Sequence, residues 1–177
     1  QKWTLFPYTT LFRSLLLATI MYKYSDFVPI APPKSYGNLI DPVITISPED
    51  DFDNILEKKK WTFMYVYENE TCDLLCEATL FVMQQVRESL GRERQRISNI
   101  LVIKDNFINE DNKKIINKYD KIRILQVIKK DFFKKLEKNH LYIIDPLGNI
   151  FIFYDKDFSA KGLKKDIKKI LKVSRIG

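Results

Sequence analysis

Cys72 and Cys76 are the two cysteines of the 177-residue chain, so thiol chemistry can take place only at this pair. They follow an apolar, strand-like run and open a run with helical spacing. Residues four apart lie on one face of a helix, so the two sulfur atoms could form a short disulfide or bind one metal ion. The start of a helix also stabilises a thiolate, which is the nucleophile and the ligand of soft metals. The spacing therefore predicts a redox or metal-binding corner.

Strands and helices alternate around this corner. Apolar or alternating runs predict strands at residues 61–67, 100–103 and 122–128. Residues 141–144 and 150–154 flank a turn with proline and glycine and predict a β-hairpin. Helical spacing predicts helices at residues 47–58, 72–90, 109–119, 131–138 and 161–172. This order resembles a thioredoxin-like α/β fold, a three-layer sandwich whose mixed central sheet ends in an antiparallel hairpin.

The N-terminal part has a different character. We expect residues 1–14 to be a non-native scar, because they resemble translated adapter sequence. Residues 15–24 combine an apolar run at 15–22 with an aromatic and basic border, which favours the remnant of a membrane anchor. The apolar run is shorter than the ~20 residues of a spanning helix. The alternative is an unrelated short helix. Prolines predict a linker at residues 25–42, and one domain then covers residues 43–177.

Composition places the chain among ordinary globular proteins. Hydrophobic residues make up 45% of it and charged residues 30%, which excludes a disordered protein. The formal net charge is +7, and the lysines gather in the C-terminal half. No glycine-rich or aromatic nucleic-acid motif accompanies this charge, so we expect a solvated lysine surface and no nucleic-acid partner.

Two stretches of the chain resemble the Sco/SenC family. Residues 60–67 with Thr71–Cys76 resemble the strand and the Cys-x-x-x-Cys loop of that family, and residues 141–149 resemble its final hairpin. Similarity to short, single-anchor bacterial Sco-like proteins is carried by residues 38–42, 84–91 and 171–177. The resemblance implies a thioredoxin-like protein, anchored in the cytoplasmic membrane with its domain in the periplasm. It also implies a role in cytochrome c oxidase assembly, with an oxidase subunit or its assembly factors as partner.

The resemblance further implies a Cu(I) site formed by Cys72 and Cys76, with His140 as the candidate third ligand. The chain departs from the family at this site. Asp73 and Glu77 stand where the family has proline after each cysteine, and His140 lies closer to the end of the hairpin strand than the family's ligand histidine. Such a shift reverses the face of an extended strand, so ligation by His140 would need a local bulge or loop.

Three mechanisms remain open for the cysteine pair. The thiolates could bind and deliver Cu(I), which tolerates low coordination numbers. They could instead reduce a disulfide of an oxidase subunit, with Cys72 attacking and Cys76 resolving. In the third mechanism, Cys72 and Cys76 would form a structural disulfide that stabilises a non-catalytic domain, and this domain would bind an assembly partner. The acidic neighbours Asp73 and Glu77 raise the pKa of a nearby thiol and oppose the helix dipole.

Overall fold

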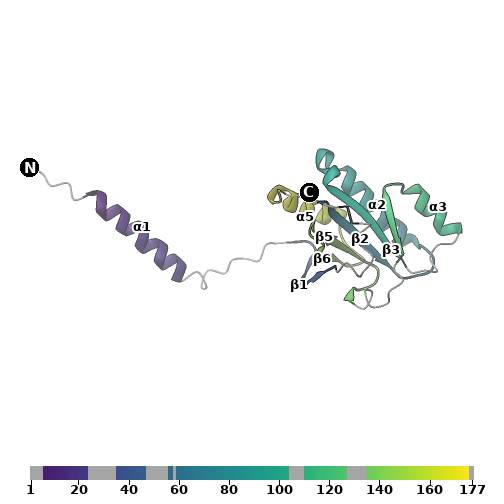
Figure 1. Ribbon diagram of the computed structural model, residues 1–177, viewed down its shortest axis with the longest axis horizontal. Helices are drawn as coiled ribbons and strands as arrows, with labels where there is room; N and C mark the ends of the chain where they lie inside the picture. Colours follow the sequence, from purple (N-terminus) through teal and green to yellow (C-terminus); the bar gives the residue numbers. More distant parts are fainter. Residues whose placement is uncertain are drawn as a thin grey trace, which may run out of the picture. The chain divides into compact units, whose positions relative to one another are not determined.

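The structure is a computed structural model that describes residues 6–23, 35–46, 56–57, 59–103, 110–126 and 135–175. It divides into two units, residues 1–34 and 35–177 (Figure 1). The described part of the first unit is a helix, α1 (Phe6–Lys23), which starts inside the segment expected to be a scar. Among the described residues, no helix has both the length and the apolar character needed to cross a membrane.

The second unit is built on a six-stranded sheet in the order β1-β6-β5-β2-β3-β4. Its strands are β1 (Asn38–Thr45), β2 (Trp61–Tyr67), β3 (Ile97–Ile103), β4 (Ile122–Gln126), β5 (His140–Ile144) and β6 (Asn149–Tyr154). Strands β2, β3 and β4 run parallel, whereas β5 is antiparallel to β2, and β6 is antiparallel to both β5 and β1. The predicted α/β class, with a mixed sheet that ends in an antiparallel hairpin, is confirmed.

Helices connect the strands and cover the sheet. They are α2 (Leu74–Glu88), α3 (Glu110–Lys118), α5 (Ala160–Val173) and the short 3₁₀ helix η3 (Gly91–Arg96). Each α-helix begins and ends within two residues of a predicted helix. The helices expected at residues 47–58 and 131–138 fall largely outside the described residues.

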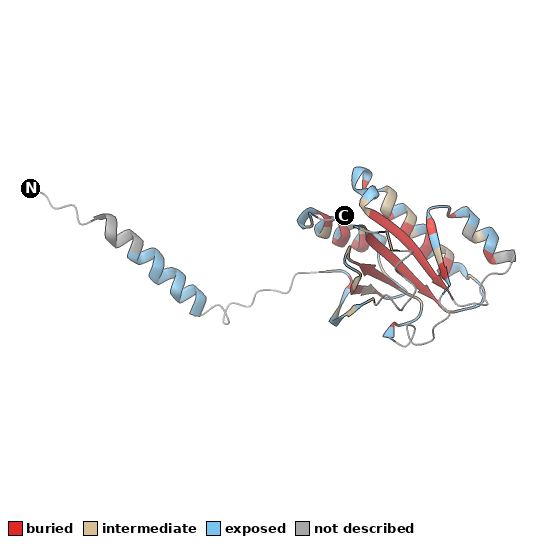
Figure 2. Cartoon of the chain, in the orientation of Figure 1, coloured by how far each residue is buried: buried red, intermediate tan, exposed pale blue. Residues whose placement is uncertain are grey.

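Every residue of β2 and β3 is buried, as expected for central strands covered on both faces (Figure 2). Alternation along β2 divides its side chains between two apolar clusters. Phe63, Tyr65 and Tyr67 pack with α2 and α5 on one face, whereas Met64 and Val66 pack with the other face of the sheet. These two strands therefore form the rigid platform from which α2 starts.

Two strands differ from the expectation. β1 occupies residues 38–42 of the expected linker, and its side chains are mostly exposed, so it lacks the apolar run that marks a buried strand. Its pairing with β6 is irregular between Leu39 and Ile44, a stretch that contains Pro42, which has no N–H to donate. β3 begins three residues earlier than expected, because the polar Ser98 is buried and its hydroxyl bonds to that of Thr62 at 2.9 Å.

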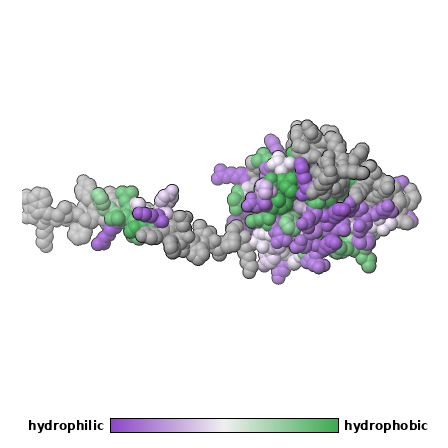
Figure 3. Space-filling model, turned by 90° about the horizontal axis from the view of Figure 1, so that it is seen from below, coloured by the Kyte–Doolittle hydropathy of each residue, from purple (hydrophilic) through white to green (hydrophobic). Residues whose placement is uncertain are grey.

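The surface of the domain carries mainly the polar side chains that the core leaves out. Seen from below, the described surface is mainly hydrophilic, with hydrophobic residues in smaller areas (Figure 3). α5 shows the reason, because it buries Leu163, Ile167 and Leu171 against the sheet and carries most of its lysines on exposed positions.

The start of β1 is held by Asp166, a buried residue of α5. Its Oδ2 accepts the backbone N–H groups of Tyr36 at 2.7 Å and Gly37 at 3.0 Å, and the hydroxyl of Tyr154 at 2.9 Å. Two glycines allow this close approach. A Cβ on Gly37 would lie 2.7 Å from the ring of Tyr154, and one on Gly162 would lie 2.8 Å from Cβ of Tyr36.

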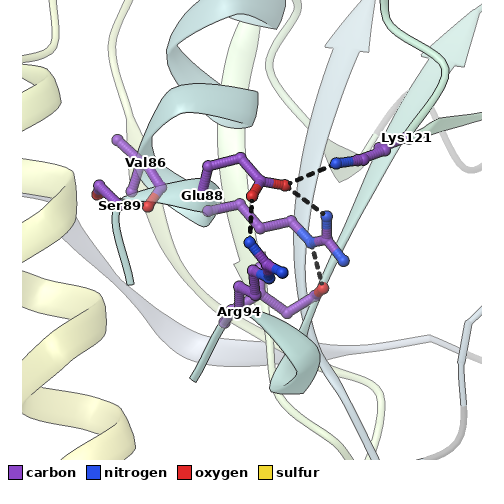
Figure 4. Close-up of polar contacts among 7 residues, drawn as sticks. Val86, Glu88, Ser89, Arg94 and Lys121 are labelled. Atoms are coloured by element: carbon purple, nitrogen blue, oxygen red, sulfur yellow. Dashed lines mark hydrogen bonds and ion pairs between the residues drawn. The ribbon is translucent and has the colours of Figure 1, made fainter. Parts of the chain in front are cut away.

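The far end of α2 is held by Glu88 (Figure 4). Its carboxylate accepts hydrogen bonds from Arg94 of η3 at 2.9 Å and from Lys121, which precedes β4, at 3.1 Å. Arg87 is 3.4 Å from the same carboxylate and donates through Nε to the carbonyl oxygen of Ile97 at 2.8 Å. Glu88 therefore links three elements at the end of α2 that lies away from the cysteines.

Replacing Asp166 by alanine should lower the free energy of unfolding of the full chain by about 3 kcal/mol, because a buried carboxylate that accepts three hydrogen bonds is lost. Denaturant unfolding measures this loss, and hydrogen exchange should show that the amides of β1 become more exposed. Asp157→Ala, at an exposed aspartate, is the matched control. Equal losses in the two variants would contradict the role assigned to Asp166.

Replacing Glu88 by glutamine should lower the free energy of unfolding at neutral pH by about 1 kcal/mol or less, because the ion pairs are partly exposed and screened. The hydrogen bond from Lys121, with the charges of Arg94 and Arg87, lowers the pKa of Glu88 in the folded protein. Its contribution is therefore present above the ordinary glutamate pKa of about 4.3 and is lost as the pH falls through the lower folded value.

Denaturant unfolding of the wild-type and Glu88→Gln proteins, at neutral pH and again near pH 3, checks this dependence. The difference should shrink in acid and at high salt. Glu93→Gln removes a single exposed ion pair and serves as control. A difference that stays constant from neutral to acid pH would show that the charge of Glu88 does not stabilise this end of α2.

Candidate functional site

Cys72 and Cys76 lie at the corner between β2 and α2. β2 ends at Tyr67, and Cys72 is the last residue before the N-cap of α2, whereas Cys76 is in the first turn of the helix. The two cysteines form a disulfide with their Cα atoms 5.3 Å apart. The structure thus brings together the two residues expected to carry the chemistry.

The two cysteines differ in exposure. Cys76 is completely buried in the cluster between the sheet and the helices. Cys72 is only partly buried and packs against the edge of that cluster. A partner can therefore approach Cys72 more easily than Cys76, which is the asymmetry that an attacking and a resolving thiol require.

Asp73 determines where α2 begins. Its extended backbone and its side chain form the N-cap, and Oδ1 accepts the N–H of Cys76 at 2.8 Å. Its carbonyl oxygen accepts the N–H of Glu77 at 2.9 Å, the first bond of the helix. The helix accordingly starts at Leu74, two residues later than expected, because an aspartate that caps a helix precedes its first turn.

Two residues outside the corner hold the loop that carries Cys72. Asn112 of α3 is buried; its Oδ1 accepts the N–H of Cys72 at 2.9 Å, and its Nδ2 donates to the carbonyl oxygen of Glu70 at 2.7 Å. The hydroxyl of Tyr67 donates to the carbonyl oxygen of Thr71 at 2.7 Å and lies 3.3 Å from the N–H of Asp73.

Sequence reasoning missed both of these residues. Asn112 stands in a polar helix where an asparagine normally faces water, and Tyr67 fits the apolar strand that contains it. The order of the strands could have indicated that α3 lies near the cysteine loop. The carboxyl ends of the parallel strands β2 and β3 lie side by side, and α3 follows β3.

His140 does not lie with the cysteines. It is the first residue of β5, opposite Val66 in β2. Its ring packs edge-on against Phe153, with the two ring centroids 5.8 Å apart. Tyr142 packs against Phe153 on the same face of the sheet, whereas Cys76 belongs to the apolar cluster on the other face. Nδ1 is 2.7 Å from the carbonyl oxygen of Lys138, and Nε2 is 3.2 Å from Asp155.

The donor set at the corner is therefore two sulfur atoms. No group of three or more histidine, cysteine, aspartate or glutamate side chains with the geometry of a metal site occurs in the part of the chain that the structure describes. Two thiolates of the reduced pair fit a soft ion of low coordination number such as Cu(I).

An open groove of about 240 Å³ lies between α2 and the end of α3, and it begins at Leu74 and Glu77, which are close to the cysteines in sequence. Its lining residues are Leu74, Glu77, Ala78, Phe81, Lys118 and Tyr119. Leu74, which stands between the cysteines, is 88% exposed, and Phe81 is 52% exposed. Glu77 and Lys118 form an ion pair of 2.6 Å across the groove; this hydrogen bond lowers the pKa of Glu77 and raises that of Lys118.

Several solved structures share this fold. Sco1 from Thermus thermophilus, in its apo form, is 12% identical with a TM-score of 0.54, and the match covers 79% of this chain and 99% of that one. Yeast Sco1 with copper bound is 14% identical with a TM-score of 0.54, covering 66% and 81%. A SCO1/SenC family lipoprotein from Bacillus anthracis is 14% identical with a TM-score of 0.51, covering 73% and 93%.

At these identities the structural matches show the fold alone, and they confirm that the chain has the thioredoxin-like architecture of Sco proteins. No curated protein sequence matches the chain. Residues 61–174, from the start of β2 to the end of α5, match the family model described as the transmembrane-like, thioredoxin-like, C-terminal domain. The chain therefore belongs to the family of transmembrane-like, thioredoxin-like C-terminal domains.

Proposed function

We propose that this protein exchanges thiols and disulfides with the cysteines of a partner through Cys72 and Cys76. The observation that carries the proposal is the unequal exposure of the two sulfur-bearing residues at the start of α2. A structural disulfide needs no such asymmetry, whereas exchange requires one sulfur that a partner can reach and a second that stays protected until the first has reacted.

The reduced pair would act in two steps. The thiolate of Cys72 attacks one sulfur of the partner's disulfide, forms a mixed disulfide and expels the partner's other sulfur as a thiolate. The thiolate of Cys76 then attacks the sulfur of Cys72, closes the internal disulfide and releases the partner's second thiolate. Two electrons and the two thiol protons pass to the partner, so that the exchange balances.

The groove beside the pair supports a protein partner. Leu74, two residues after Cys72, and Phe81, about two helical turns further along α2, expose apolar side chains in this groove. An exposed apolar patch near a reactive group favours docking of a polypeptide. The resemblance to the Sco/SenC family suggests that this partner is a cytochrome c oxidase subunit or an assembly factor. The cysteines that would be reduced are then those of the oxidase copper site.

The same resemblance suggests the compartment. A disulfide persists in oxidising compartments such as the periplasm, and the matched family carries the description "transmembrane-like". Residues 15–24, whose apolar part at residues 15–22 lies in α1, are the proposed remnant of an anchor in the cytoplasmic membrane, from which the domain would face the periplasm.

Copper binding is the second candidate, with Cu(I) as cargo held by the thiolates of reduced Cys72 and Cys76. Soft thiolates suit Cu(I), and yeast Sco1, which shares the fold, was solved with copper bound. Thiol exchange takes precedence because His140 lies on the opposite face of the sheet, which leaves two sulfur ligands at the site.

Trapping a mixed disulfide tests the exchange. The Cys76→Ser variant, mixed with oxidised glutathione, should accumulate a protein–glutathione disulfide at Cys72, because the resolving thiol is gone. Cys72→Ser should form this adduct at least tenfold more slowly, since Cys76 is buried. Intact-mass measurement over time gives both rates. Equal rates, or no adduct in either variant, would contradict the assigned roles.

Anaerobic Cu(I) titration of the reduced protein against a competing chelator tests the second candidate. One-to-one binding that is lost in both serine variants would establish a copper site of two thiolates. His140→Ala should leave that affinity unchanged within about twofold, because the imidazole faces away from the cysteines. A loss of affinity in His140→Ala would show that His140 reaches the metal, and no binding at all would remove the copper candidate.

A further inference from the structure

We infer that Asp73 and Asn112 keep the reduction potential of the Cys72–Cys76 pair low, so that the pair donates electrons to a partner's disulfide and does not oxidise a partner's thiols. This inference rests on the proposed function and names the residues that favour its reducing direction. Asp73 acts through its charge and its capping bond, and Asn112 is a positioning residue.

The backbone N–H groups of both cysteines lie at the corner. Backbone N–H groups at a helix start stabilise a thiolate, and a stabilised thiolate favours the reduced form of the pair. Here the N–H of Cys76 already donates to Oδ1 of Asp73, and the N–H of Cys72 donates to Oδ1 of Asn112. The backbone donors of both cysteines are therefore occupied by side-chain oxygen atoms.

Three acidic residues stand close to the pair in sequence. Glu70 and Asp73 flank Cys72, and Glu77 follows Cys76. Lys118 of α3 neutralises Glu77, whereas no ion pair involves Asp73 among the residues that the structure describes. Asp73 therefore places a negative charge beside Cys72, which disfavours a second negative charge on the thiolate.

The charge of Asp73 also reaches the buried side of the corner. Tyr65, in β2, belongs to the same apolar cluster as Cys76. Burial raises the pKa of Tyr65, and the negative charges of Tyr67 and Asp73 add to the rise. A neighbouring thiol experiences a carboxylate in the same sense, since both groups become negative when they lose a proton.

The occupied N–H donors and the charge of Asp73 together set the direction of the redox equilibrium. Because the thiolate is not stabilised, the equilibrium moves toward the disulfide, and the dithiol becomes the stronger reductant. In the exchange described above, the protein loses two electrons and two protons, and the partner's disulfide becomes two thiols. A dithiol protein on the same side of the membrane would return the pair to its reduced form.

The decisive variant is Asp73→Asn, which removes the charge and keeps a side chain that caps helices equally well. The readout is the equilibrium between the full-length protein and glutathione, in which the protein disulfide and two glutathione thiols give the dithiol and oxidised glutathione. We expect its constant to rise about tenfold, which corresponds to a shift of about 30 mV. The pKa of the Cys72 thiol, from the pH dependence of its alkylation, should fall.

Asp73→Ser repeats the test with a second neutral cap. Asp120→Asn, at an exposed aspartate away from the corner, controls for the change in net charge and should leave the constant within twofold of the wild type. Asn112→Ala frees the N–H of Cys72 and should raise the constant in the same direction, but by less than Asp73→Asn.

The outcomes separate the inference from the proposed function. If the wild-type pair exchanges with glutathione but Asp73→Asn and Asp73→Ser leave the constant unchanged, the inference is overturned and the exchange function stands. A constant that falls in both variants would also overturn it. A wild-type disulfide that no thiol reduces in the folded protein would overturn both.

Discussion

Asp73 accepts the N–H of Cys76 at the first turn of α2, and Asn112 accepts the N–H of Cys72 from α3. These two hydrogen bonds fix both ends of the cysteine loop, so the rest of the site depends on them. They hold Cys72 at the edge of the apolar cluster while Cys76 stays inside it. They also use the donors that would otherwise stabilise a thiolate, so the same geometry that exposes one sulfur makes it a less acidic thiol.

The sheet supplies the platform for this loop. β2 and β3 are buried along their whole length, and their carboxyl ends lie side by side. α2 and α3 follow those ends, so a residue from each helix meets at one corner. Glu88 holds the other end of α2, and Asp166 holds β1 against the hairpin side of the sheet. These contacts lie away from the cysteines and leave their loop free for chemistry.

Part of this arrangement could be predicted from the sequence. The central strands, the hairpin and α2 have strong apolar patterns, because each buries one whole face or both. The position of the cysteines at a strand-to-helix corner could be predicted because they stand between the β2 and α2 patterns. β1 escaped prediction because an exposed edge strand buries too little to have a pattern, and the prolines at positions 29, 32 and 33 before it suggested a linker.

The polar contacts of the site could not be read from local patterns. Asn112 is buried where α3 meets the loop that follows β2, a contact between segments about 40 residues apart in the chain. The position of His140 depends on strand alternation. Its register opposite Val66 places it on the face away from the cysteines, and a single residue of slip would have reversed this.

The central claim is that Cys72 is the reactive thiol and Cys76 the protected one. Alkylation of the fully reduced, folded protein with iodoacetamide, followed by peptide mass spectrometry at short times, tests it most directly. The account predicts that Cys72 is modified at least tenfold faster than Cys76, and that the two rates become similar in denaturant. Equal rates in the folded protein, or faster modification of Cys76, would contradict the account.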